Sequence, residues 1–205
     1  MHYQSIFLLA LISTCLNSSG QHTIKRCQAL NNIAMEAYMN YQMEGRPSSL
    51  DSALNFIDQA ISCDTNKFGP FHNKINILID VGRYQDAINI IGETERRFPP
   101  IPFYTALKAI CFYRLGDSLA FEFWRDNAID ASESRLELLN KREVVLDILM
   151  IRCILYGKSS AFELLDNLKR KGINEVDYTY YKEWIEGMQP FESTNSIEFQ
   201  IEPSR

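Results

Sequence analysis

Histidine is scarce in this chain, and its scarcity bears on both catalysis and metal binding. Only His2, His22 and His72 occur, and no H-E-x-x-H sequence or His/Cys cluster offers ligands for zinc or iron. The chain also lacks G-x-x-x-x-G-K-S/T, G-x-G-x-x-G and G-x-S-x-G, the common phosphate-binding loops and the nucleophile elbow. We therefore expect no catalytic residue, no cofactor, no metal and no enzymatic activity.

Runs of basic residues are missing as well. The formal net charge is -5, and no lysine or arginine cluster is long enough to follow a phosphate backbone, so nucleic acid is not an expected partner. Hydrophobic residues make up 46% and charged residues 23% of the chain, which excludes a wholly disordered protein. Glycine (9) and proline (7) are few among 205 residues, as expected for helices joined by short turns.

The first 24 residues contain no Asp, Glu, Lys or Arg. Within them Ile6–Leu16 is an apolar run of about eleven residues, too short to span a bilayer but typical of a signal-peptide core. Small residues at Ser18 and Gly20 suit cleavage before Gln21, which would release a soluble secreted protein.

A second processing route begins from the same segment. Ile12-Ser13-Thr14-Cys15 resembles a bacterial lipobox, in which the cysteine is lipidated, and a polar tether follows it up to Gly20. Thr14 departs from the usual Gly or Ala, and His2 stands where a basic residue is usual. We expect lipidation at Cys15 and a membrane-anchored lipoprotein facing the periplasm or cell surface, with the soluble form as the alternative.

Four cysteines follow Cys15: Cys27, Cys63, Cys111 and Cys153. Their spacings of 36, 48 and 42 contain no C-x-x-C and match no disulfide framework, although an even number in an exported chain permits disulfides. Each cysteine falls within a predicted helix, where it behaves as a small hydrophobic residue. We therefore favour free buried thiols over disulfides.

The middle of the chain repeats itself at an interval of 34 residues. The pattern of residues in Ala53–Ala60 recurs in Ala87–Thr94, and an interval of this length is typical of stacked helical repeats. The first helix is predicted from Cys27 through Tyr41, and Gly45–Ser49 breaks it. A second helix is predicted from Leu50, with Ser49 or Asp51 as its N-cap and an inner face of Ala53, Ile57, Ala60 and Ile61.

The next unit repeats this hairpin as Phe68–Val81, a turn at Gly82–Asp86, and Ala87–Arg97. The spacing of glycine, small and bulky residues resembles the tetratricopeptide repeat (TPR) family over residues 27–170. The residues that carry the resemblance are Gly82, Tyr84, Ala87, Ile91 and Pro99 in the second unit, Tyr41, Gly45, Ala53, Ile57, Ala60 and Thr65 in the first, Phe112, Leu115–Asp117, Ala120 and Trp124 in the third, and Tyr156, Gly157, Ala161 and Leu165 in the fourth. Thr94 departs from the usual alanine.

The resemblance implies an all-α fold: a right-handed α-solenoid of about four TPR-like helical hairpins with a C-terminal capping helix. The capping helix is predicted over Glu175–Glu186, after Gly172–Asn174 ends the fourth hairpin. The segment Ala131–Arg142 is longer than a repeat junction, and we predict it to be helical, either extending the third unit or starting the fourth early. Residues 1–20 form the signal peptide and tether, residues 21–187 the TPR-like helical repeat domain, and residues 188–205 a flexible tail. Within the tail, alternation at Ile197–Glu202 is compatible with strand addition to a partner.

TPR proteins commonly bind peptides or helices in the concave groove lined by the first helix of each hairpin, and the resemblance assigns groove positions to this chain. They are Met35, Met39, Gln42 and Met43; His72, Asn76, Ile79 and Asp80; Ala106, Ile110, Tyr113 and Arg114; and, from a weaker alignment, Asp147, Ile151, Ile154 and Leu155. The surface is mixed and leans apolar, which suits a hydrophobic segment, with methionines able to adapt to several shapes. The alternative is that the apolar members belong to the core.

The resemblance favours a non-catalytic protein–protein interaction scaffold or adaptor in the cell envelope. Its expected partner is another protein or a peptide, and its expected contact with the membrane is through the lipid anchor only. An immunity-type lipoprotein that neutralises a toxin would use the same scaffold. From another class, a small carbohydrate-binding or hydrolase subunit would require an aromatic platform or paired carboxylates in a cleft, whereas pairs such as Glu93 and Glu95 are better explained as solvated helix surface.

Overall fold

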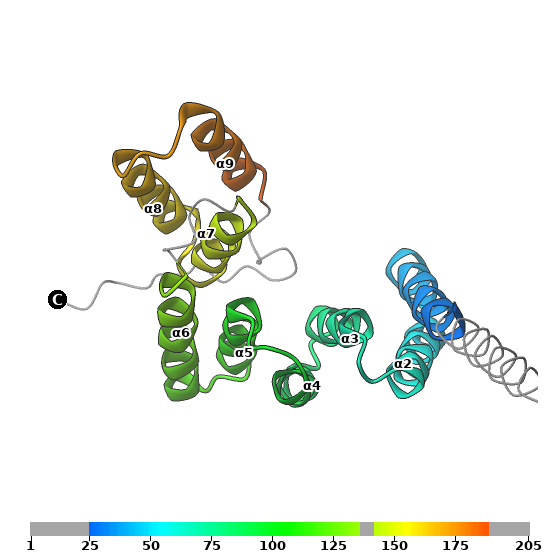
Figure 1. Ribbon diagram of the computed structural model, residues 1–205. Helices are drawn as coiled ribbons and strands as arrows, with labels where there is room; N and C mark the ends of the chain where they lie inside the picture. Colours follow the sequence, from blue (N-terminus) through cyan, green and yellow to red (C-terminus); the bar gives the residue numbers. More distant parts are fainter. Residues whose placement is uncertain (1–24, 136–141, 189–205) are drawn as a thin grey trace, which may run out of the picture. The chain divides into compact units, whose positions relative to one another are not determined.

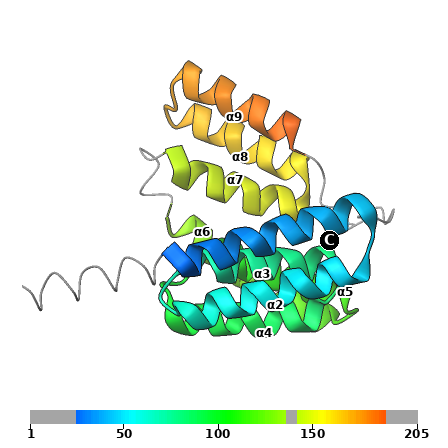
Figure 2. The same cartoon turned by 90° about the vertical axis from the view of Figure 1, so that its right-hand side faces the viewer.

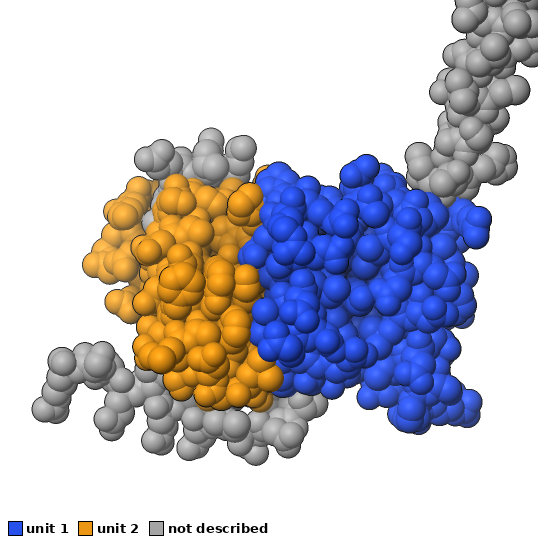
Figure 3. All heavy atoms as spheres, turned by 90° about the horizontal axis from the view of Figure 1, so that it is seen from below, with its two compact units in different colours: residues 1–99 blue, residues 100–205 orange. Residues whose placement is uncertain are grey.

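The computed structural model describes residues 25–135 and 142–188. All regular secondary structure in these ranges is helical, which confirms the all-α class (Figure 1). The chain divides into two compact units, Met1–Pro99 and Pro100–Arg205, which Figure 3 colours separately. The expected signal peptide, the lipidation site Cys15 and the tail from residue 189 onward lie outside the described residues.

From residue 25 onward, where the described residues begin, unit 1 consists of a helix over residues 25–44 followed by three further helices. These are α2 (Pro47–Cys63), α3 (Phe68–Asp80) and α4 (Tyr84–Arg97). The helix over residues 25–44 runs antiparallel to α2, and α3 packs against both α2 and α4 (Figure 2). Ala53, Ile57 and Ala60 of α2 are fully buried, as the repeat pattern predicts.

The start of α2 differs from the prediction. The helix begins at Pro47, three residues before Leu50, and its N-cap is Arg46, whose side chain makes no capping hydrogen bond. Proline suits the first helical position because its φ angle is already helical and its missing N–H would have no intrahelical acceptor there. The Ser49 and Asp51 N-caps predicted from the sequence are therefore wrong.

A disulfide joins Cys27 to Cys63, with 5.4 Å between their Cα atoms. It connects the first turns of the helix over residues 25–44 to the last residue of α2, and so closes this antiparallel pair. The expectation of free thiols is wrong for these two cysteines, because the antiparallel pairing brings together residues that the helical pattern alone places on separate elements. Cys111 and Cys153 are free.

Unit 2 contains the remaining five helices of the described chain. They are α5 (Pro102–Arg114), α6 (Ser118–Glu133), α7 (Arg142–Tyr156), α8 (Lys158–Arg170) and α9 (Glu175–Gly187). Helix α5 packs against α6 and α7, and α7 in turn packs against α8 and α9. Tyr181 and Ile185 of α9 are buried in a cluster with residues of α7 and α8, so this closing helix packs as expected. Helix α9 lies beside α8 (Figure 2).

The junction after α6 is another departure. The helix ends at Glu133, and Ser134 and Arg135 form a turn, so the prediction that this segment is helical is wrong at these two residues. The Ser134 hydroxyl donates a hydrogen bond to the carbonyl of Ala131 at 2.9 Å, and the Ser132 hydroxyl donates one to the carbonyl of Ile129 at 2.8 Å. Such local bonds compete with the helical ladder, which favours a helix end here. The rest of the predicted segment lies at residues 136–141, outside the described residues, until α7 begins at Arg142.

No helix of the described residues is long and apolar enough to cross a membrane.

Candidate functional site

The predicted groove residues divide into exposed and buried sets. In unit 1, Met39 (58% exposed), Met43 (73%), Gln42, Asn76 and Asp80 are exposed, Met35 and His72 are half-buried, and Ile79 is buried. In unit 2, Ala106 and Ile110 belong to a core cluster that also contains Ile151, Ile154 and Leu155. Tyr113, Arg114 and Asp147 are half-buried. The side chains of this set that a partner could reach therefore lie mainly in unit 1.

We call the exposed and half-buried members in unit 1, together with the half-buried Asn73, the amide–methionine surface. It consists of Met35, Met39, Gln42 and Met43 from the helix over residues 25–44, and His72, Asn73, Asn76 and Asp80 from α3. Each set lies on one face of its helix, because its members are spaced mostly three, four or seven residues apart. Two helices therefore contribute to one surface.

Hydrogen bonds connect the two helices along this surface. The Asn73 amide donates to Asn31 Oδ1 at 3.0 Å, and seven residues further along both helices the Tyr38 hydroxyl donates to Asp80. Gln42 Nε2 lies 3.1 Å from both the Tyr38 hydroxyl and Asp80 Oδ2, and donates to each. Both cross-helix pairs span 42 residues, so the helices are parallel and in a fixed register.

Sequence reasoning missed Asn31 and Tyr38 as parts of this site. Tyr38 is buried, at 7% exposed, yet its hydroxyl reaches the edge of the surface and donates a hydrogen bond to Asp80. The hydrogen-bonded residues are 42 positions apart and are not equivalent positions of the 34-residue repeat, so the repeat pattern does not reveal them.

The amide–methionine surface carries little charge. Burial lowers the pKa of His72, whose ring lies 3.0 Å from the Asn76 amide nitrogen, so the imidazole is neutral at physiological pH. Asp80 is the one charged member, and two side chains donate hydrogen bonds to it. A surface of amides and thioethers can take apolar side chains and can also pair with main-chain N–H and C=O groups.

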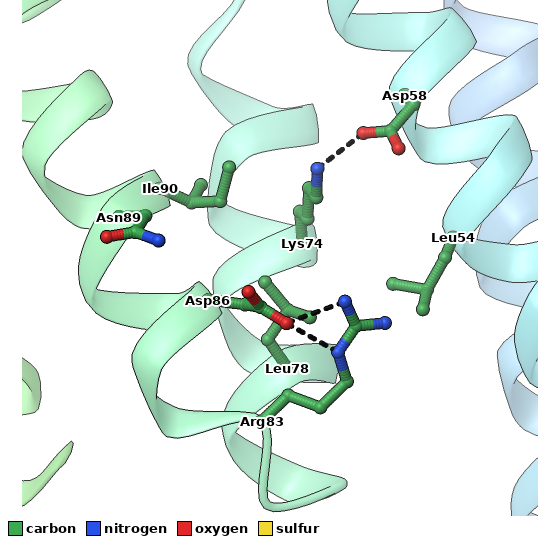
Figure 4. A pocket seen from close by; sticks show the side chains of 8 residues that line it. All are labelled: Leu54, Asp58, Lys74, Leu78, Arg83, Asp86, Asn89 and Ile90. Atoms are coloured by element: carbon green, nitrogen blue, oxygen red, sulfur yellow. Dashed lines mark hydrogen bonds and ion pairs between the residues drawn. The ribbon is translucent and has the colours of Figure 1, made fainter.

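Unit 1 also contains a cavity of about 240 Å³ between α2, α3 and α4 (Figure 4). Its lining combines apolar and charged side chains: Leu54, Asp58, Lys74, Leu78, Arg83, Asp86, Asn89 and Ile90. No predicted groove residue lies in it.

Unit 2 exposes apolar side chains on α6 and just before it. Leu119 is 81% exposed, Phe123 59% and Leu115 47%. Leu119 and Phe123 are one helical turn apart and lie on the same side of α6. The structure does not place any predicted groove residue on this side of the helix.

The free cysteines are poor nucleophiles in this fold. Burial raises the pKa of the Cys111 thiol to about 12 and that of Cys153 to about 11, so both are protonated at neutral pH. Within the part of the chain that the structure describes, no group of three His, Cys, Asp or Glu side chains is arranged to hold a metal ion.

Comparison with known proteins finds no counterpart: no protein-family model, no curated protein and no solved structure matches the chain.

Proposed function

We propose that this protein is a non-catalytic scaffold or adaptor that binds a segment of another protein on the amide–methionine surface of unit 1. The observation that carries the proposal is the exposure of Met39, Gln42 and Met43 on a helix that hydrogen bonds join to α3, where Asn76 is exposed. Large apolar side chains held in water mark interaction sites when they gather with polar groups that can pair with a partner.

The partner segment is uncharged and partly apolar. Its apolar side chains contact the two methionines, and its main-chain N–H and C=O groups pair with the side-chain amides of Gln42 and Asn76. A strongly acidic segment would be repelled by Asp80, and a strongly basic one would find a single carboxylate that already accepts two hydrogen bonds.

We also propose that the helices are TPR-like hairpins, stacked as a right-handed α-solenoid. The packing in unit 2 supports this, because α5 contacts both its neighbour α6 and the first helix of the next hairpin, α7. Helix α7 has the same relation to α8 and α9. In such stacks the first helix of each hairpin lines one common face. The helix over residues 25–44 and α3 are the first helices of the first two hairpins, and they carry the amide–methionine surface.

Export to the cell envelope and lipidation at Cys15 complete the proposal. The disulfide between Cys27 and Cys63 supports an oxidising compartment, because structural disulfides form and persist outside the reducing cytosol. The lipid would hold the chain at the membrane while unit 1 binds its partner.

The test is affinity capture from the envelope fraction with the wild-type mature chain and with the double variant Met39→Glu, Met43→Glu. Both methionines are exposed, so the variant stays folded. When the partner binds, the two introduced carboxylates become buried in the interface, and the free-energy cost of burying them prevents binding. The matched control is Leu119→Glu, which places the same charge on another exposed apolar residue. A partner retained by the double variant, or lost equally from the control, contradicts the proposed site. Mass spectrometry of the captured chain also reports whether Cys15 carries lipid.

A further inference from the structure

The cavity in unit 1 lies on a different face from the amide–methionine surface. Lys74 and Leu78 line it from α3, whereas Asn76 and Asp80 of the same helix lie on the amide–methionine surface. Residues two apart on a helix point in nearly opposite directions, so α3 separates the two sites. The cavity therefore has no part in the proposed partner binding.

Its charges form two close pairs. Lys74 Nζ lies 2.5 Å from Asp58 Oδ1, which joins α3 to α2. Arg83 approaches the single oxygen Asp86 Oδ2 with Nε at 2.7 Å and Nη2 at 2.6 Å (Figure 4). The Lys74 side chain is 17% exposed and its partner Asp58 55%, so the lysine lies deep and the carboxylate lies at the rim.

Each pair leaves donors and acceptors available. Lys74 has two further N–H groups, Asp58 has Oδ2, and Asp86 has Oδ1. The third guanidinium nitrogen of Arg83, Nη1, points away from Asp86 toward Leu54 (Figure 4). The cavity thus offers cationic donors and anionic acceptors, together with the apolar side chains of Leu54, Leu78 and Ile90.

We propose that this cavity binds a free α-amino acid with an apolar side chain. The lining carries two cations and two anions, so an anion alone meets two carboxylates and a cation alone meets Lys74 and Arg83. A zwitterion satisfies both signs. Its carboxylate binds Lys74 Nζ and Arg83 Nη1, its ammonium binds the remaining oxygens of Asp58 or Asp86, and its side chain packs on the apolar residues.

The size of the cavity agrees with this ligand. About 240 Å³ is below the range of drug-sized ligand pockets, as expected for a small molecule such as an amino acid. Stability alone does not account for the arrangement, because the exposed Arg83–Asp86 pair contributes little to folding, and both pairs surround a hollow lined by apolar side chains.

The test is titration of the mature full-length chain with L-leucine, followed by calorimetry and by amide chemical shifts. A ligand of this size in an open cavity is expected to bind with a dissociation constant on the order of 1 mM. Two probes each lack one charge: 4-methylpentanoate has no ammonium and 3-methylbutylamine has no carboxylate. Each is expected to bind about tenfold more weakly than leucine or worse.

Variants assign the binding to the cavity. Arg83→Gln and Lys74→Met are each expected to weaken leucine binding about tenfold or more. Arg97→Gln is the matched control, because Arg97 lies at the opposite end of α4 from the N-cap Arg83 and pairs with Glu93 at 2.9 Å outside the cavity. Circular dichroism verifies that each variant is folded. If one of the two cavity variants does not fold, the leucine affinity of the other variant tests the proposal.

Three outcomes overturn the proposal. One is the absence of any leucine-dependent shift of cavity residues at concentrations about tenfold above the expected constant. Another is binding of 4-methylpentanoate as tightly as leucine, which would indicate a simple anion site. The third is a folded Arg83→Gln or Lys74→Met variant that binds leucine like the wild type. Because the site is separate from the amide–methionine surface, these results leave the proposed partner binding untouched.

Discussion

Removing the disulfide between Cys27 and Cys63 is expected to destabilise unit 1 strongly. The bridge closes a loop with a sequence separation of 36 residues. In the chain-entropy treatment, a cross-link over this length restricts the unfolded chain by about 4 kcal/mol at 25 °C. Because small domains are stable by about 5–15 kcal/mol, this is a large share of the total.

The assay is urea unfolding followed by circular dichroism, for the wild-type mature chain and for the double variant Cys27→Ala, Cys63→Ala. The variant is expected to lose about 2–4 kcal/mol, with the entropy figure as the upper end because the unfolded chain retains some structure. Adding a reductant to the wild type should reproduce most of the loss, since Cys111 and Cys153 are already free. Reductant should leave the double variant unchanged.

Thiol titration gives an independent readout of the same bridge. The denatured, unreduced chain without Cys15 is expected to show two reactive thiols, those of Cys111 and Cys153. In the folded chain both should react slowly, because burial raises the pKa of each thiol and shields it. Four thiols before reduction, or a stability change below about 1 kcal/mol in the variant, would refute the reasoning.

Other perturbations test the helical framework and its titration. Gly82→Ala is expected to destabilise by about 1 kcal/mol because φ is +75° at this turn, whereas Gly92→Ala, inside α4 with ordinary contact distances, should stabilise by about 0.5–1 kcal/mol, both measured by urea unfolding. Phe71→Ala should cost about 3–5 kcal/mol, since the ring is fully buried against Phe98; a loss below about 1 kcal/mol would contradict that packing. Burial lowers the pKa of His72 below its unfolded value of 6.5, so its contribution is complete above about pH 6.5 and declines as the pH falls below that value. His72→Gln should flatten this part of the stability profile, and an unchanged slope would exclude His72 as its cause.

The helices could be predicted from the sequence because glycines mark the turns that separate them. Gly82, Gly116 and Gly157 have positive φ angles, and each lies at the turn where the repeat pattern places it. The buried positions follow from the same helical period, since a residue spaced three or four from a core residue shares its face. Even Thr94, which departs from the TPR pattern, stays buried because its hydroxyl donates to the carbonyl of Ile90 at 2.8 Å.

The parts that could not be predicted depend on how helices meet. The disulfide requires Cys27 and Cys63 to face each other across an antiparallel pair, and helical periodicity fixes faces but no inter-helix register. The pairing of Tyr38 with Asp80 has the same origin. The sequence does not decide whether Ala106 and Ile110 belong to the groove or to the core, because the first helix of a hairpin presents apolar residues in either case; the packing shows that they belong to the core.

The most direct test of the proposed function is site-specific photo-crosslinking in the native envelope. A photoreactive amino acid is placed in turn at Met39 and Asn76, which both lie on the amide–methionine surface, and at Leu119, which is exposed on α6. The account predicts that positions 39 and 76 crosslink to one and the same partner protein and that position 119 does not. A partner captured at position 119 but at neither 39 nor 76 would contradict it.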